Sequence, residues 1–98
     1  MIPWMGAVHH SHHEVRIQLR QDPGARALRR AAKRACRMAR KQLAKAGGVN
    51  VHGELRGADG GILLVLHLDI HSADASNENR EECARTFEST FRRELSIS

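Results

Sequence analysis

Residues 49–71, VNVHGELRGADGGILLVLHLDIH, decide which fold this chain can adopt. In the first part Val49, Val51 and Leu55 share one face, and from Ile62 to His71 a more apolar run also alternates. Strict alternation is typical of half-buried strands, because successive side chains in a strand point to opposite faces. The glycine-rich interval at residues 57–61 predicts a hairpin turn between the two strands. With the turn centred between residues 59 and 60, His52 lies opposite His67.

The segment before this hairpin predicts one more strand and a helix. Glu14 to Arg20 alternates, with Val15, Ile17 and Leu19 on one face. Residues 25–46 repeat alanine and leucine at helical spacing and end at a glycine pair, which is a strong helix stop. We expect Asp22 to cap this helix and Pro23 to occupy its first position.

After the hairpin, a polar connection leads to a last helix from about residue 78. Its acidic start (Glu78, Glu81 and Glu82) and basic end suit the helix dipole. The order strand–helix–strand–strand–helix predicts an α+β, two-layer sandwich with β-α-β-β-α order, a truncated ferredoxin-like fold. In it, both helices cover one face of a three-stranded antiparallel sheet, with the third strand between the other two. Residues 14–98 form this domain, and residues 1–13 are expected to be a flexible, histidine-rich tail.

The composition favours an anionic partner. The 98 residues carry a net charge of +5, and only three of them are aromatic. Two isolated cysteines, Cys36 and Cys83, are expected to be free thiols in a reducing compartment. No apolar run approaches the ~20 residues that span a bilayer, and the N-terminus lacks a signal-peptide pattern. We therefore expect a cytoplasmic protein without a membrane role.

The first helix is basic on one side only. Between Gly24 and Ala46 there are nine basic residues and no acidic one, and six of the nine are arginine. At 100° per residue they occupy an arc of roughly 160°, opposite an alanine and leucine face. The residues expected to bind are Arg26, Arg29, Arg30, Lys33, Arg34, Arg37, Arg40 and Lys41, followed by Lys45.

A solvated face usually mixes charges, because like charges one turn apart repel. Alternatively, the acidic start of the second helix neutralises part of the arc. Arginine-rich faces favour phosphate or carboxylate recognition, and few aromatic residues are present to stack on single-stranded bases. We therefore expect a non-enzymatic protein that binds structured RNA, including ribosomal RNA, or duplex DNA. The alternative is a small regulator or inhibitor, of phage or mobile-element type, that docks on an acidic protein.

A second candidate site lies on the sheet face away from the helices. Residues of one strand that are two apart share a face, so this face collects His52, His67, Asp69 and His71. Imidazole and carboxylate groups are ligands for zinc, iron or nickel, so these four residues are a candidate metal site. No other cofactor is expected. No phosphate loop or nucleophile motif is present, which disfavours an enzyme. The first strand also has an open edge, through which two copies could pair as a homodimer.

Two families resemble parts of this pattern. The order of elements and a glutamate-containing last helix resemble small bacterial regulators of the DinI type. The segment from Val49 to Gly61 resembles the first hairpin of ribosome hibernation factors, a family that places basic helices on ribosomal RNA. That second family has an extra strand before its last helix, for which this chain has no counterpart. Neither resemblance assigns a functional residue here.

Overall fold

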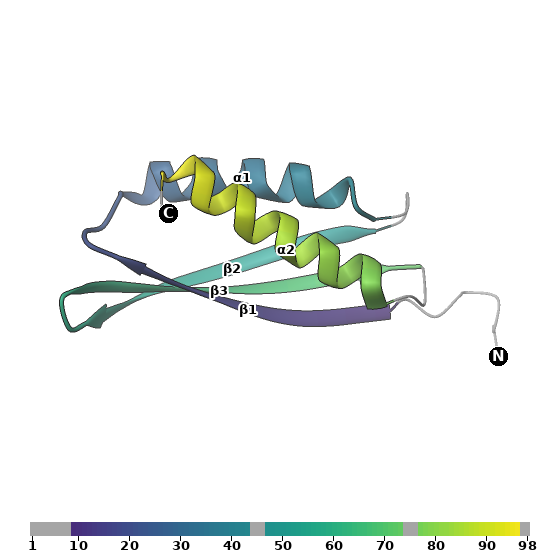
Figure 1. Cartoon of the computed structure of the whole chain (residues 1–98), viewed down its shortest axis with the longest axis horizontal. Helices are drawn as coiled ribbons and strands as arrows, with labels where there is room; N and C mark the ends of the chain where they lie inside the picture. The colour runs from purple at the N-terminus through teal and green to yellow at the C-terminus, as the bar shows by residue number, and fades with distance from the viewer. Residues whose placement is uncertain (1–8, 44–46, 74–76, 97–98) are drawn as a thin grey trace.

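The computed structural model describes residues 9–43, 47–73 and 77–96, and it confirms the predicted fold. The elements are β1 (His9–Leu19), α1 (Ala25–Arg40), β2 (Gly48–Ala58), β3 (Gly61–Ser72) and α2 (Asn77–Glu94). The three strands form one antiparallel sheet in the order β1-β3-β2. Both helices lie on the same side of it (Figure 1). The other side of the sheet is called the open face below.

The β2–β3 hairpin turns at the predicted place. Asp59 and Gly60 connect the paired residues Ala58 and Gly61, and Gly60 has a φ of 78°, which suits a residue without a side chain. The same register places His52 directly opposite His67, as predicted. Asn50 likewise lies opposite Asp69. The turn thus determines which polar side chains meet on the open face.

β1 begins earlier than the sequence indicates. The sequence predicts a flexible tail for residues 9–13, but they pair with β3, from His9 opposite Ser72 to His13 opposite Leu68. The apolar alternation that marks a strand begins only at Val15, because the inward-facing positions before it are Ser11 and His13. The predicted tail is therefore wrong for residues 9–13. Residues 1–8 lie outside the described part of the chain.

The core lies between α2, β1 and β3. Val15 and Ile17 of β1, with Leu68 of β3, are almost completely buried against Phe87 and Phe91 of α2. Burial of large apolar side chains of this kind stabilises a fold by about 1.5–3 kcal/mol for each residue. Three small residues of α1 complete this core: Ala31, Ala35 and Ala39.

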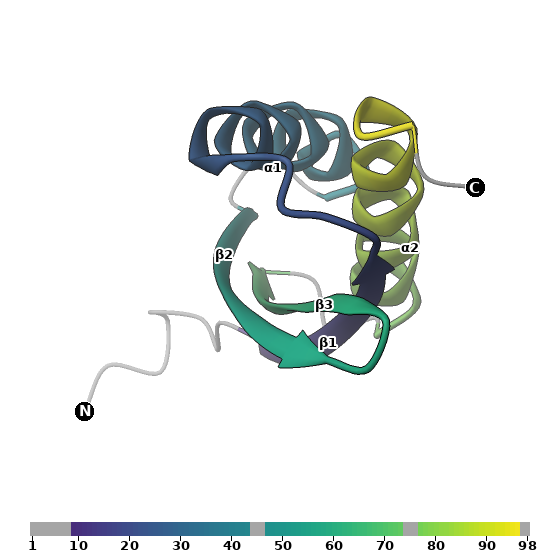
Figure 2. The same ribbon diagram turned by 90° about the vertical axis from the view of Figure 1, so that its left-hand side faces the viewer.

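The alanine stripe explains how α1 is held. Alanine side chains at i, i+4 and i+8 lie on one face, and their small size lets α1 approach α2 closely. α1 therefore packs mainly against α2 and makes fewer contacts with β2. Figure 2 shows α1 above the sheet and α2 next to it, running down along one side of the strands. The opposite side of α1 faces solvent.

The ends of α1 differ from the prediction. The residue before the helix is Gly24, with a φ of 94° and no side-chain cap. Asp22 instead accepts a hydrogen bond of 2.8 Å from the Gly24 backbone N–H, so it shapes the turn rather than capping the helix. At the other end α1 stops at Arg40, and a tighter turn continues to Leu43 through bonds from residue i to i−3. Residues 44–46 lie outside the described part.

Candidate nucleic-acid interface

The basic arc of α1 is exposed along the whole helix. We use this name for eight residues: Arg26, Arg29, Arg30, Lys33, Arg34, Arg37, Arg40 and Lys41. All eight side chains are exposed, while the alanines on the other side of the helix are buried. Because the helix is regular from Ala25 to Arg40, its cations spread along roughly 24 Å. The predicted binding residues therefore form one continuous surface.

In the described part of the chain, almost no acidic side chain neutralises this arc. Within the described residues only Arg34 forms an ion pair, at 3.5 Å between its Nε and Glu94 Oε2. The first turn of α1 contains no acidic residue. Like charges one turn apart on a helix repel each other by a few tenths of a kcal/mol per pair. The arc therefore lowers the stability of the folded protein. Among the described residues, most of the positive charge of the arc therefore has no acidic partner.

The acidic start of α2 makes its described contacts within α2 itself, away from the arc. Glu81 accepts a hydrogen bond of 2.9 Å from Asn77, and Glu82 pairs with Arg85 at 2.7 Å. The Glu82 carboxylate raises the pKa of the Arg85 guanidinium. The one acid that reaches the arc, Glu94, lies at the opposite end of α2. Intramolecular neutralisation by residues 78–82 is thus not found among the described ion pairs.

The centre of the arc has a shallow hollow. Four cations at i, i+3, i+4 and i+7 line it: Arg30, Lys33, Arg34 and Arg37. Its volume is about 120 Å³, and only cationic residues line it. Guanidinium groups present several N–H donors in one plane and bind phosphate or carboxylate oxygens in pairs. This hollow fits one anionic group of a larger partner.

The open face carries charges of both signs, and many of them are paired. Arg16 binds Glu14 at 2.7 Å, and Arg56 binds Glu54. The hydrogen bond from Arg16 lowers the pKa of the Glu14 carboxyl. His12 Nδ1 lies 3.0 Å from Asp69 Oδ1. This balanced surface contrasts with the arc on the other side of the molecule.

The structure brings the predicted histidines into a row. The ring centroids of His52 and His67 are 6.2 Å apart, and His12 stacks on the other side of His67 at 5.5 Å. His71 lies instead beside His10, at 5.9 Å. His10 and His12 were missed because they were assigned to the tail. Only the recognition that this polar segment is a strand would have placed them here.

This row does not have the geometry of a metal centre. Among the described residues no group of three or more His, Cys, Asp or Glu side chains is arranged to hold an ion. His12 Nδ1 contacts Asp69 Oδ1, and His12 Nε2 lies 3.4 Å from His67 Nδ1. These side chains therefore form hydrogen bonds with one another. Of the four predicted metal ligands, His52 and His67 lie side by side, and Asp69 is connected to His67 through His12. Metal binding by this face stays a prediction.

Polar groups also line the junction of β1 and α2. Arg80 is buried and donates hydrogen bonds to Ser11 Oγ at 2.5 Å and Ser72 Oγ at 3.3 Å. Nearby, burial lowers the pKa of His13, and its Nε2 has no hydrogen-bond partner in the described structure. These contacts hold the early part of β1 against the start of α2. We therefore assign these polar groups a structural role.

The cysteines behave as expected from the sequence, since both are free thiols. Cys83 is buried and Cys36 is half-buried. Burial raises the pKa of Cys83 to about 11 and also raises the pKa of Cys36. Thiols with raised pKa values are poor nucleophiles and poor metal ligands at neutral pH.

Comparison with known proteins adds no relative. No protein-family model, no curated protein and no solved structure matches this chain. In the described part, neither helix is both long and apolar enough to cross a membrane.

Proposed function

We propose that this chain is a binding protein that engages nucleic acid, either structured RNA or duplex DNA, through the basic arc of α1. The observation that carries the proposal is the imbalance of charge: eight exposed cations have one acidic partner among the described residues. A polyanion supplies the missing negative charge and releases its own counterions when it binds.

The chemistry of the arc favours contact with a phosphate backbone. Six of its eight residues are arginine, which binds two phosphate oxygens at once. The arc carries no aromatic side chain on which bases could stack. Such an interface positions a protein on a duplex without reading its sequence in detail. Ribosomal RNA is one partner of this class.

A matched pair of variants tests the proposal. The first, Arg30→Gln/Arg34→Gln/Arg37→Gln, removes three charges from the centre of the arc. The second, Arg16→Gln/Arg20→Gln/Arg56→Gln, removes three charges elsewhere, including the two arginines paired on the open face. At 0.1–0.2 M salt the first should bind a mixed-sequence RNA duplex about 100-fold more weakly than wild type. The second should stay within about threefold, because its charges lie off the interface.

Equal losses in the two variants would contradict the proposal, because binding would then depend on net charge alone. A pull-down with nuclease treatment separates the alternative, an acidic protein partner. A partner that is lost on nuclease treatment supports nucleic acid. If a protein instead stays bound in stoichiometric amount after nuclease treatment, and is lost only from the first variant, the partner is an acidic protein rather than nucleic acid.

A further inference from the structure

β2 is an edge strand whose helix-side face is poorly covered. Among the residues that the structure describes, it pairs with β3 on one side only, so half of its backbone N–H and C=O groups point away from the sheet. The inward apolar residues of β1, the other edge strand, are almost completely buried (Val15, Ile17 and Leu19), whereas Val51 of β2 is only half-buried and Leu55 is 40% exposed. β2 therefore combines a free edge with accessible apolar side chains.

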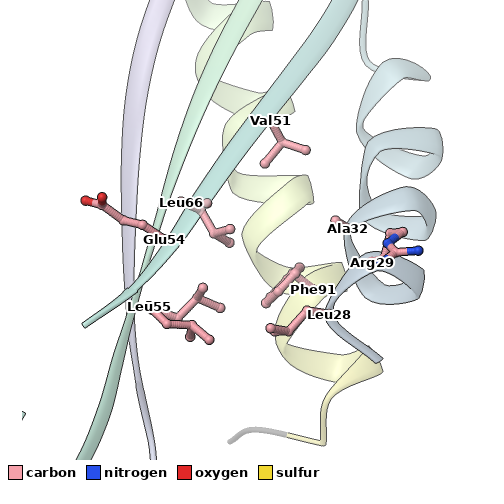
Figure 3. A pocket seen from close by; sticks show the side chains of 10 residues that line it. Leu28, Arg29, Ala32, Val51, Glu54, Leu55, Leu66 and Phe91 are labelled. Atoms are coloured by element: carbon pink, nitrogen blue, oxygen red, sulfur yellow. The ribbon is translucent and has the colours of Figure 1, made fainter. Parts of the chain in front are cut away.

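A hollow of about 420 Å³ lies between this part of β2 and the first half of α1. Figure 3 shows Leu28 and Ala32 of α1 facing Val51, Leu55 and Leu66 of the sheet, with Phe91 of α2 beside them. Gly53, the inward position between Val51 and Leu55, also lines the hollow, and the Leu66 side chain packs closely over it. A Cβ at Gly53 would lie 2.9 Å from Leu66 Cδ2. The volume is within the range of ~300–1,000 Å³ that is usual for ligand sites.

Cations border this hollow along α1. Arg29 contributes to its lining and has no ion pair within the described residues. On a helix, Lys33 and Arg40 lie within about 40° of Arg29, so the three form a row on the side of the arc that is nearest β2. Figure 3 shows the Glu54 carboxylate directed away from the hollow, and it pairs with Arg56. The charge beside the apolar hollow is therefore positive.

We propose that the β2 edge binds an extended acidic peptide, which adds a fourth strand to the sheet. Its backbone would hydrogen-bond to β2, one apolar side chain would enter the hollow beside Gly53, and flanking carboxylates would meet Arg29 and Arg40. Strand addition of this kind draws affinity from the backbone and specificity from alternate side chains. The site differs from the centre of the arc and does not depend on the proposed binding of nucleic acid.

Charge disfavours a second copy of the chain as the occupant. Pairing of β2 with β2 of another copy would place two rows of Arg29, Lys33 and Arg40 beside each other. Six cations would then face one another across the new interface, between chains that each carry a net charge of +5. An acidic strand removes this repulsion, and a basic one adds to it.

The test uses fluorescein-labelled nine-residue peptides and fluorescence anisotropy in the absence of nucleic acid. The acidic probe is Asp-Thr-Val-Thr-Leu-Thr-Val-Thr-Asp, which places Asp, Val, Leu, Val and Asp on one face of a strand. The control probe has lysine at both ends. We expect the acidic probe to bind at least about tenfold more tightly than the lysine probe. Equal binding of the two probes, or no binding of the acidic one at about 1 mM, overturns the proposal.

Two pairs of variants locate the site. Ala32→Leu fills the hollow and should weaken the acidic probe by about tenfold, whereas Ala25→Leu, at an exposed position outside it, should not. Arg29→Gln/Arg40→Gln should weaken the probe more than Arg30→Gln/Arg34→Gln does. The reverse order would overturn the proposal. Sedimentation showing concentration-dependent dimers that Ala32→Leu abolishes would assign the edge to a second copy instead.

The same variants separate this inference from the proposed function. Ala32→Leu should leave binding of an RNA duplex unchanged, because Ala32 lies outside the basic arc. Loss of RNA binding with intact peptide binding, as expected for Arg30→Gln/Arg34→Gln/Arg37→Gln, would show that the two surfaces act independently. The experiments can thus rule out peptide binding at the β2 edge without ruling out binding of nucleic acid by the arc. They can also rule out binding of nucleic acid without ruling out peptide binding.

Discussion

The basic arc of α1 and the open face of the sheet are both rich in charged side chains, but they differ in how the charges are paired. On the open face, Arg16, Arg56 and His12 each contact a carboxylate. Along the arc only Arg34 does so within the described residues. Arginine side chains are therefore paired with carboxylates on the open face, at Arg16 and Arg56, but mostly lack a described ion pair along the arc. The difference shows that pairing, rather than the number of charges, marks the candidate interface.

A change that makes α1 resemble the open face should have the largest effect on binding. Arg30→Glu with Arg37→Glu places acidic side chains one turn from Arg26, Arg34, Lys33 and Lys41. Each new ion pair adds about 0.2–0.5 kcal/mol, so the free energy of unfolding should rise by about 1 kcal/mol. Affinity for an RNA duplex should fall about 100-fold at 0.1–0.2 M salt. Urea unfolding and fluorescence anisotropy measure the two effects.

A gain in stability without loss of RNA binding would show that the arc is not the interface. A loss of both would mean that the changed side chains disturb the fold. Helicity measured by circular dichroism provides the control, because glutamate and arginine have similar helix propensities.

The alanine stripe beneath the arc gives the next largest effect. Ala35 is completely buried where α1 packs on α2, so Ala35→Leu forces the helices apart. Overpacking of this kind costs about 1–3 kcal/mol of unfolding free energy. Ala25→Leu, at an exposed position of the same helix, should change it by less than about 0.5 kcal/mol. Equal effects in urea denaturation would mean that α1 is not held by the stripe.

A smaller effect is expected on the pH dependence of the free energy of unfolding, through a histidine on the helix side of the sheet. Burial lowers the pKa of His13, while Glu81 opposes the shift and His12 and Arg80 add to it. Above the ordinary value of 6.5 this histidine is neutral in both states. As the pH falls below 6.5, the unfolded chain takes up the proton first, so stability decreases. His13→Gln should flatten this dependence between pH 7.5 and 5 in urea titrations.

The matched control is His52→Gln on the open face, where the side chain is exposed. It should keep the decrease in stability of the wild-type protein at low pH. A profile that His13→Gln leaves unchanged would contradict the assignment of this effect to His13.

The sequence predicts the fold well because alternation and turn residues report directly on local structure. The hairpin turn at residues 59–60 and the pairing of His52 with His67 both follow from short-range patterns. The sequence does not reveal the start of β1 because Ser11 and His13 face inward without being apolar, and hydrogen bonds with Asn77 and Arg80 of α2 hold Ser11 there. The basic arc was visible from helical spacing alone. The hollow beside Gly53 was not, because it depends on how far α1 stands from β2.

The salt dependence of wild-type binding tests the central claim most directly. Affinity for a mixed-sequence RNA duplex would be measured between about 50 and 200 mM KCl, with the Arg30→Gln/Arg34→Gln/Arg37→Gln variant in parallel. Contact of about six phosphates with the basic arc predicts a slope near −5 when the logarithm of affinity is plotted against the logarithm of salt concentration. The variant should lose about 3 from that slope. Equal slopes for the two proteins, or a wild-type affinity that does not change with salt, would contradict the claim.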